Sequence, residues 1–316
     1  MFRRSLIVSA VGGPAWAQDR PVRMIVPFLQ GGTTDSFARR VAGRMQAPLG
    51  QPVTVVNMPG RAGVVGTLEV VRARPDGQTI LFVTASTLFL HGQLAEPSQF
   101  RPLADLVPVS LVGTTLVVFA IRPDGASGLA ALLDVAREHP LRIRHGSPSV
   151  GSYLHLTTEL LKREAGRLQL THTPYGNSRL ATQGLARGEV DFVTATLANT
   201  LQAHRQGEVR IVAVASAGRS PLLPEVPTVA ECLSLPSFEA ALWMALMLPA
   251  GGPVTMRDRL AYAINSTLAN GPLRSELAQS GFEVGGLLSP PAITAFLRAE
   301  QERWLPIVQA IGARPG

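Results

Sequence analysis

The sequence of 316 residues has little cysteine, little lysine and few aromatic side chains. Its single cysteine, Cys232, cannot form an internal disulfide, which excludes a small disulfide-stabilised scaffold. Lys162 is the single lysine, and the arginines behind the formal net charge of +7 are scattered rather than clustered. Because aromatic residues make up only 5% and do not alternate with arginine, we expect no nucleic-acid partner.

Motifs for cofactors and metals are also missing. The sequence has no nucleotide-binding P-loop, and Gly60, Gly63 and Gly66 do not have the spacing of a dinucleotide-binding loop. No histidine stands at metal-ligand spacing from another histidine or from the cysteine. We therefore expect neither a cofactor nor a bound metal.

Long hydrophobic runs are absent too, since a bilayer span needs about 20 apolar residues. The chain opens with an arginine pair, a short apolar stretch and the small-residue sequence Ala15-Trp16-Ala17, which is typical of a secretory signal peptide. We expect residues 1–17 to be removed and the mature chain to be exported. The apolar runs at 106–121 and 240–248 are interrupted or short and predict buried strands.

What the sequence does have is a regular alternation of strands and helices. Residues 22–28 predict a strand, which a glycine loop joins to a helix through Phe37. Strands at 53–56 and 80–84 continue the series, with a helix at 64–71 between them. Such repetition predicts a parallel sheet covered by helices.

A second series begins after the turn Arg122-Pro123-Asp124-Gly125. Its expected strands are residues 141–144, 168–171, 190–194 and 209–215. The helices after residue 254 are too few for a third domain, so we expect them to return to the first. The sequence thus predicts a two-lobed α/β fold, each lobe a mainly parallel sheet flanked by helices, with a ligand cleft between the lobes. Domain I would comprise residues 18–121 and 225–316, and domain II residues 122–224.

Two loops rich in glycine and hydroxyl side chains join a strand to a helix, one in each series. They are Gly31-Gly32-Thr33-Thr34-Asp35 and Ser147-Pro148-Ser149-Val150-Gly151-Ser152-Tyr153. Free backbone N–H groups at a helix N-terminus suit a carboxylate, so the two loops predict an anion site in the cleft. The alternative is that the hydroxyls only cap the helices and that Asp35 offsets the helix dipole.

Several segments resemble the receptors of tripartite tricarboxylate transporters, the TctC or Bug solute-binding proteins. They extend over nearly the whole mature chain and comprise residues 26–35, 57–66, 75–77, 108–112, 151–156, 172–175, 188–191 and 219–231. The resemblance implies a periplasmic protein of two α/β lobes whose cleft closes on a small carboxylated ligand by hinge motion.

The resemblance also implies that backbone groups, hydroxyls and bridging waters of the two loops hold the ligand carboxylates. The expected ligand-binding residues are Phe28, Gly31, Gly32, Thr33, Thr34, Asp35, Thr84, Ser147, Ser149, Gly151, Ser152, Tyr153, Tyr175 and Asp191. Asp191, at a strand end, would contact the distal part or an amine of the ligand, or alternatively cap a helix. The chain departs from the family pattern at Leu29, Gln30, Ser149 and Gly176, so the resemblance leaves the ligand's identity open.

Taken together, these features predict a non-enzymatic extracytoplasmic receptor. It would capture a small organic anion and deliver it to the integral-membrane permease subunits of a transporter. Two alternatives remain. One is a ligand sensor for a signalling partner. The other is a small-molecule hydrolase with Ser149 or Ser152 as nucleophile and His155 or His172 as base, which no spacing rule supports.

Overall fold

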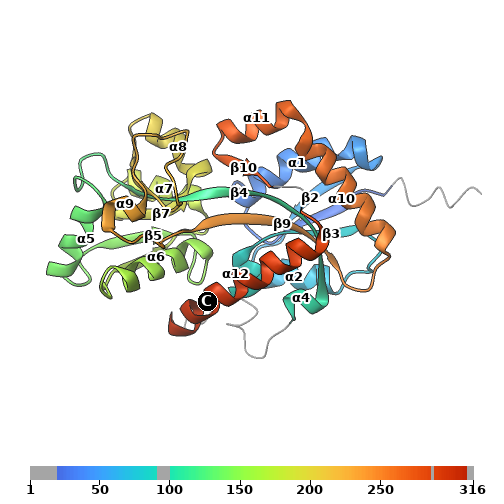
Figure 1. Cartoon of the computed structure of the whole chain (residues 1–316), viewed down its shortest axis with the longest axis horizontal. Helices are drawn as coiled ribbons and strands as arrows, with labels where there is room; N and C mark the ends of the chain where they lie inside the picture. The colour runs from blue at the N-terminus through green and yellow to red at the C-terminus, as the bar shows by residue number, and fades with distance from the viewer. Residues whose placement is uncertain (1–19, 91–99, 286–287, 312–316) are drawn as a thin grey trace, which may run out of the picture.

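A computed structural model of the chain describes residues 20–90, 100–285 and 288–311 (Figure 1). The expected signal peptide at 1–17 lies outside the described residues. Two lobes lie side by side, and the strands β4 (Leu106–Ile121) and β9 (Ala241–Pro249) run between them. The predicted α/β fold of two lobes is confirmed. In the part of the chain that the structure describes, no helix is both long and apolar enough to cross a membrane.

The first lobe contains a parallel group of three strands, with β1 (Val22–Val26) between β2 (Val53–Asn57) and β3 (Thr79–Thr84). The crossing strands β9 and β4 extend this sheet in antiparallel fashion, and β10 (Phe282–Val284) pairs with β4. The helical elements of this lobe are η2 (Arg61–Gly63), α1 (Thr33–Leu49), α2 (Val64–Val71), η3 (Ser86–Leu90), α4 (Pro102–Asp105), α10 (Val254–Ala269) and α11 (Gly271–Gln279).

The second lobe repeats this plan. The parallel strands are β7 (Phe192–Thr196), β5 (Arg144–Ser147) and β6 (Thr171–Pro174), and the end of β4 pairs antiparallel with both β7 and β8 (Arg210–Val214). The helices of this lobe are α5 (Leu129–Glu138), α6 (Tyr153–Glu164), α7 (Ser178–Ala186), α8 (Leu197–Arg205) and α9 (Val229–Leu233).

Strand β4 belongs to both lobes and connects their sheets. Residues Leu106–Leu116 pair with β9, and Val117–Ile121 pair with β7. The pairing with β9 shifts register between Pro108 and Ser110 and again between Leu111 and Gly113. Such irregularities bend a strand and increase its twist, so β4 curves from one sheet into the other. The parallel strands lie at the two outer ends of the sheet, and the crossing strands β9 and β4 lie between them.

The amphipathic pattern of α1 shows how the first lobe's core forms. Phe37, Val41 and Met45 recur every four residues, and all three side chains are fully buried. This spacing places them on one helix face, which packs against α10 and the sheet. Burial of each such side chain contributes about 1.5–3 kcal/mol. The helix begins at the first glycine loop, so its core contacts also position that loop.

The last helix, α12 (Pro290–Ile311), contacts β4 and η3 as well as α6 of the second lobe. On this helix, Trp304 is buried and its ring lies 4.6 Å from that of Tyr153, measured between centroids. Thus α10 and α11 return to the first lobe as expected, whereas α12 lies along both lobes (Figure 1).

Two expected strands of the second lobe are displaced along the chain. Strand β5 begins at Arg144 rather than residue 141, and β6 begins at Thr171 rather than residue 168. Leu141 and Arg167 have φ angles of 64° and 59°, so the chain turns where the apolar residues cluster and extends only afterwards. The strands themselves carry polar residues such as His145, which the hydrophobic pattern does not register.

Candidate functional site

A cavity lies between the two lobes, where the loops before α1 and α6 face each other. The end of β3 and the turn between β6 and α7 complete it. Its lining residues are Phe28, Leu29, Gly32, Thr33, Thr34, Thr84, Ser86, Pro148, Ser149, Ser152, Tyr153, Leu154, Gly176, Asn177, Ser178 and Leu242. No charged side chain is among them. The cavity is therefore neutral and contains many hydroxyl groups.

Three helices begin at this cavity, but only one of them lacks a side-chain cap. The Ser152 hydroxyl caps α6 by accepting from the His155 N–H at 3.2 Å. The Asn177 side chain caps α7 by accepting from the Leu180 N–H at 2.9 Å. Helix α1 starts after Gly32 without any side-chain cap. Its first N–H groups thus remain without intrahelical partners, in a form that suits a carboxylate. The capping alternative holds for Ser152 and not for Thr33 or Thr34.

Asp35 shapes the first loop from beneath rather than lining the cavity. Its carboxylate accepts hydrogen bonds from the Gly31 N–H (2.8 Å), from Arg39 Nε (2.9 Å) and from Asn57 Nδ2 (2.9 Å). Burial opposes the charged form, but the hydrogen bonds from Arg39, Gly31 and Asn57 outweigh it and hold the pKa of this carboxyl below its usual value. The charged Asp35 therefore fixes the loop and is already neutralised by Arg39.

The end of β3 and the start of η3 each supply a further hydroxyl. The Ser86 hydroxyl accepts a hydrogen bond from the Tyr153 N–H at 2.8 Å, which links the two lobes. Thr84 is 1% exposed, and its hydroxyl has no hydrogen-bond partner among the described residues. A buried hydroxyl without a partner is costly. At the cavity wall, Thr84 is therefore ready to bond a ligand or a water that accompanies one.

Thr33 joins the first loop to the second lobe. Its hydroxyl lies 2.7 Å from the hydroxyl of Thr196 and accepts a hydrogen bond from Asn199 Nδ2 at 2.8 Å. Thr196 ends β7, and Asn199 lies in the first turn of α8. Both contacts join residues of different lobes. The two lobes are therefore in direct contact beside the cavity.

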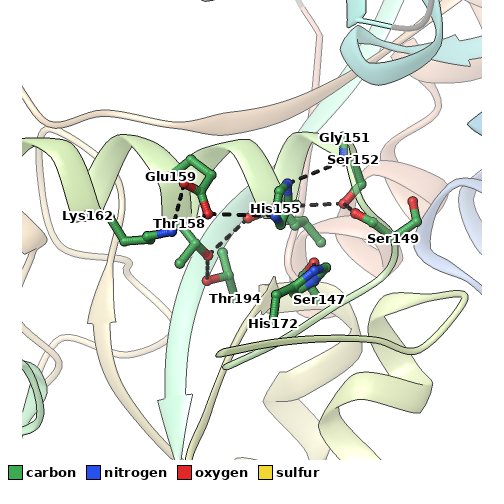
Figure 2. A network of polar contacts seen from close by, with 11 residues as sticks. Ser147, Ser149, Gly151, Ser152, His155, Thr158, Glu159, Lys162, His172 and Thr194 are labelled. Carbon is green, nitrogen blue, oxygen red and sulfur yellow. Dashed lines mark hydrogen bonds and ion pairs between the residues drawn. The ribbon is translucent and has the colours of Figure 1, made fainter. Parts of the chain in front are cut away.

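The second loop rests on three histidines that sequence spacing does not bring together. The rings of His145, His155 and His172 have centroids 4.3–6.1 Å apart. The Gly151 N–H donates to His155 Nδ1 at 3.2 Å, and the Ser147 hydroxyl lies 2.8 Å from His172 Nε2 (Figure 2). The rings therefore support the loop from below, although no sequence spacing pairs these three histidines.

Burial keeps these imidazoles neutral. Burial, and to a smaller extent Lys162, lowers the pKa of His155 to about 4. Burial together with the neighbouring His155 lowers the pKa of His172 to about 4, and burial holds the pKa of His145 well below its usual value. Lys162 itself pairs with Glu159 at 2.8 Å (Figure 2). Within the described residues, no group of three histidine, cysteine or acidic side chains is arranged to hold a metal.

The serine and histidine pairs do not form the geometry of an activated nucleophile in the cavity. The Ser152 hydroxyl donates to the Ser149 carbonyl at 2.8 Å and accepts from the His155 backbone, not from its ring. Ser147 does contact His172, but its side chain is completely buried and does not line the cavity. These hydroxyls hold the loop together.

The structure divides the residues expected at the site into two groups. Those that line the cavity are Phe28, Gly32, Thr33, Thr34, Thr84, Ser149, Ser152 and Tyr153. Those that lie outside its lining are Gly31, Asp35, Ser147, Gly151, Tyr175 and Asp191.

Tyr175 and Asp191 bind other parts of the second lobe. Tyr175 donates its hydroxyl proton to Glu189 at 2.8 Å. Asp191 accepts two hydrogen bonds from the Arg144 side chain and one from its N–H. Because Arg144 begins β5 and Asp191 precedes β7, this pair lies at the amino ends of the parallel strands, on the edge opposite the cavity.

The sequence reasoning missed the turn before α7. Gly176, Asn177 and Ser178 line the cavity, and the strand, turn and helix around them repeat the arrangement of the two predicted loops. That repetition could have identified this turn from the sequence as a third loop of the site. The turn also brings two departures from the family pattern into contact: a Cβ on Gly176 would lie 3.0 Å from Leu29 Cδ1. The missing side chain at position 176 therefore makes room for Leu29, while Gln30 is exposed.

Comparison with known proteins places the chain in a family. The family model described as the tripartite tricarboxylate transporter family receptor matches residues 37–313. The protein BugT of Bordetella pertussis is 34% identical over 297 residues, covering 93% of this chain and 90% of the relative. The chain belongs to the tripartite tricarboxylate transporter receptor family, whose members are periplasmic solute-binding proteins.

Solved structures agree with this assignment. MatC from Rhodopseudomonas palustris, with bound malate, matches with a TM-score of 0.85 and 29% identity, over 92% of this chain and 99% of that one. A second R. palustris protein, solved with adipate, has a TM-score of 0.86 and 29% identity, over 93% and 97% of the two chains. The family and the fold are those of solute-binding proteins.

Proposed function

We propose that this protein is an extracytoplasmic receptor that captures a small dicarboxylate by closure of its two lobes. The observation that carries the proposal is the neutral cavity at the uncapped N-terminus of α1. Beside it lies the Thr84 hydroxyl, which has no hydrogen-bond partner in the described part of the chain. The malate and adipate bound to the two similar proteins support a ligand of this class.

One ligand carboxylate would accept hydrogen bonds from the first N–H groups of α1 and from the Thr34 and Thr84 hydroxyls. Ser149 and the α7 turn would contact the ligand from the second lobe. A ligand that contacts both lobes stabilises the closed state by its differential affinity for that state. The predicted division is domain I (18–121 and 225–316) and domain II (122–224), with the hinge in β4 and β9. Because α9 packs against α5 and β8, we propose that it moves with domain II and that the chain returns to domain I at β9.

The wider role follows from the family. We infer that an N-terminal signal peptide exports the chain and that the loaded receptor delivers its ligand to integral-membrane permease subunits. A ligand sensor for a signalling partner would bind its ligand in the same way. Co-purification of the ligand-loaded mature protein with its membrane partner distinguishes the two roles, because a permease is expected only for the transport role.

Calorimetric titration of the mature protein with mono-, di- and tricarboxylates tests the binding function. We expect saturable binding of a dicarboxylate, and a loss of about 1 kcal/mol of binding free energy in Thr34→Ala, which removes one hydroxyl from the cavity wall. Thr171→Ala is the matched control, because Thr171 is exposed at the start of β6. Binding of none of the acids by folded, ligand-free protein would contradict the proposal.

A further inference from the structure

One arginine stands beside the residues that line the cavity. Arg179 is exposed at the second position of α7, directly after the cavity residues Asn177 and Ser178. Its guanidinium reaches the first loop of the other lobe, since a Cβ built on Gly31 would lie 2.9 Å from Arg179 Nη2. The guanidinium makes no hydrogen bond or ion pair within the described residues. Arg39, the other arginine at the first loop, is instead paired with Asp35.

The position of Arg179 is electrostatically unfavourable for the protein alone. The N-terminus of a helix carries a positive partial charge, which favours acidic and disfavours basic residues in the first turn. Helix α7 has no acidic residue in its first turn to offset Arg179. The first turn of α7 therefore does not stabilise the Arg179 charge. An exposed guanidinium beside a cavity can instead pair with an anion that enters the cavity.

The cavity itself cannot neutralise a doubly charged ligand. Its lining has no charged side chain, and Asp35 below the first loop is already paired with Arg39. Backbone N–H groups and hydroxyls at α1 can hold one carboxylate. A second carboxylate on the same ligand needs a cation, and Arg179 places one at the rim between the lobes.

We propose that Arg179 determines selectivity for dicarboxylates over monocarboxylates by pairing with the ligand carboxylate farther from α1. This inference rests on the proposed function and adds the group that recognises the second charge. The guanidinium lies beside Gly31 of the other lobe, and the neighbouring Gly32, Asn177 and Ser178 line the cavity. A planar guanidinium can bind a carboxylate through two parallel hydrogen bonds, which a lysine cannot reproduce.

The test compares ligands of equal length that differ in one charge: adipate with hexanoate, and malate with 2-hydroxybutyrate. Calorimetry measures each Kd for the full mature chain and for Arg179→Gln. We expect the affinity for the dicarboxylate that the wild type binds best to fall roughly five- to tenfold, as for one partly exposed charge-assisted pair. Affinity for the matched monocarboxylate should stay within about twofold, and Arg179→Lys should recover part of the loss.

Arg142→Gln is the matched control. Arg142 is also exposed and lies in the second lobe, but it precedes β5 and so stands at the edge away from the cavity. This change should leave both affinities unaltered, which separates a local contact from the effect of net charge. Added salt should reduce the wild-type preference for the dicarboxylate, because an exposed pair is screened. The apparent melting temperature of ligand-free Arg179→Gln should equal or exceed that of the wild type.

The outcomes separate this inference from the proposed function. If the wild type binds a dicarboxylate and Arg179→Gln binds it equally well, or if both ligands of a pair weaken together, the role of Arg179 is wrong and the receptor function stands. If the folded wild type binds neither ligand of either pair and no other carboxylate, the proposed function fails and this inference fails with it.

Discussion

Thr84 and Thr87 are buried threonines whose hydroxyls both lack a hydrogen-bond partner among the described residues. Only Thr84 lines the cavity. This difference makes them a natural pair for separating binding from stability. An unpartnered buried hydroxyl lowers stability, and a valine of the same shape removes that cost.

We predict that Thr84→Val raises the unfolding free energy of the ligand-free protein by about 1 kcal/mol and weakens carboxylate binding by about the same amount. Urea unfolding measures the first effect and calorimetry the second. Thr87→Val should give the stability gain with unchanged affinity. Equal affinity in the two variants would show that Thr84 does not contact the ligand.

At the residue scale, several residues of the two predicted loops line the cavity. Thr33, Thr34 and Ser149 were expected at the site and do line the cavity. Leu242 also lines it, but it comes from the middle of an apolar strand and has no local feature that marks it. Asp191 was expected at the site from the resemblance. Its predicted strand, 190–194, already placed it near the amino end, whereas the cavity lies at the carboxyl ends of the parallel strands.

At the scale of elements, the loop before α6 depends on the histidine cluster beneath it. His155 and His172 are neutral in the folded protein above about pH 4, because burial lowers the pKa of each to about 4. An unfolded histidine has a pKa of about 6.5. Between these values the unfolded chain binds protons that the folded chain does not, so stability falls as the pH falls.

We predict that the unfolding free energy decreases from pH 6.5 towards pH 4, by about 1.4 kcal/mol per pH unit for each such histidine, and that their contribution levels off below pH 4. His172→Gln should reduce this slope by about 1.4 kcal/mol per pH unit, which is the contribution of one proton. Urea unfolding at several pH values measures it. His139→Gln is the control, since His139 is exposed. A slope that His172→Gln leaves unchanged would contradict the buried, neutral state of this ring.

Elements were predicted best where periodicity is strong. The pattern of Phe37, Val41 and Met45 predicted α1, and the long apolar run at 106–121, although interrupted, predicted β4 with its observed ends. Strands β5 and β6 are only four residues long and carry histidine and threonine, so their apolar neighbours shifted the expected positions. The histidine cluster arises because β5 and β6 pair in register, placing His145 beside His172, with His155 above them on α6.

At the scale of the whole molecule, Thr33 links the two lobes through Thr196 and Asn199. Neither of these partners lines the cavity. The double change Thr196→Val/Asn199→Ala therefore weakens contact between the lobes without altering the cavity wall. Loss of two hydrogen bonds shifts the population toward separated lobes, and a smaller closed population lowers apparent affinity.

We predict that this double variant has a larger radius of gyration without ligand, that saturating dicarboxylate restores the compact form, and that its affinity is about tenfold weaker. Small-angle scattering and calorimetry measure these effects. Thr158→Val is the control, because Thr158 bonds Thr194 within one lobe and should affect stability alone. A variant that is as compact and binds as tightly as the wild type would disprove the role of these contacts in closure.

The sequence by itself determined the class of fold, the two glycine and hydroxyl loops and the family, because each of these depends on local periodicity, turn chemistry or short motifs. The tertiary structure alone decided which side chains meet. It placed the turn before α7 in the cavity, Arg179 against Gly31, and the three histidines beneath the second loop. Such contacts join residues far apart in the chain, and they depend on strand register and on the approach of the two lobes, which no local pattern encodes.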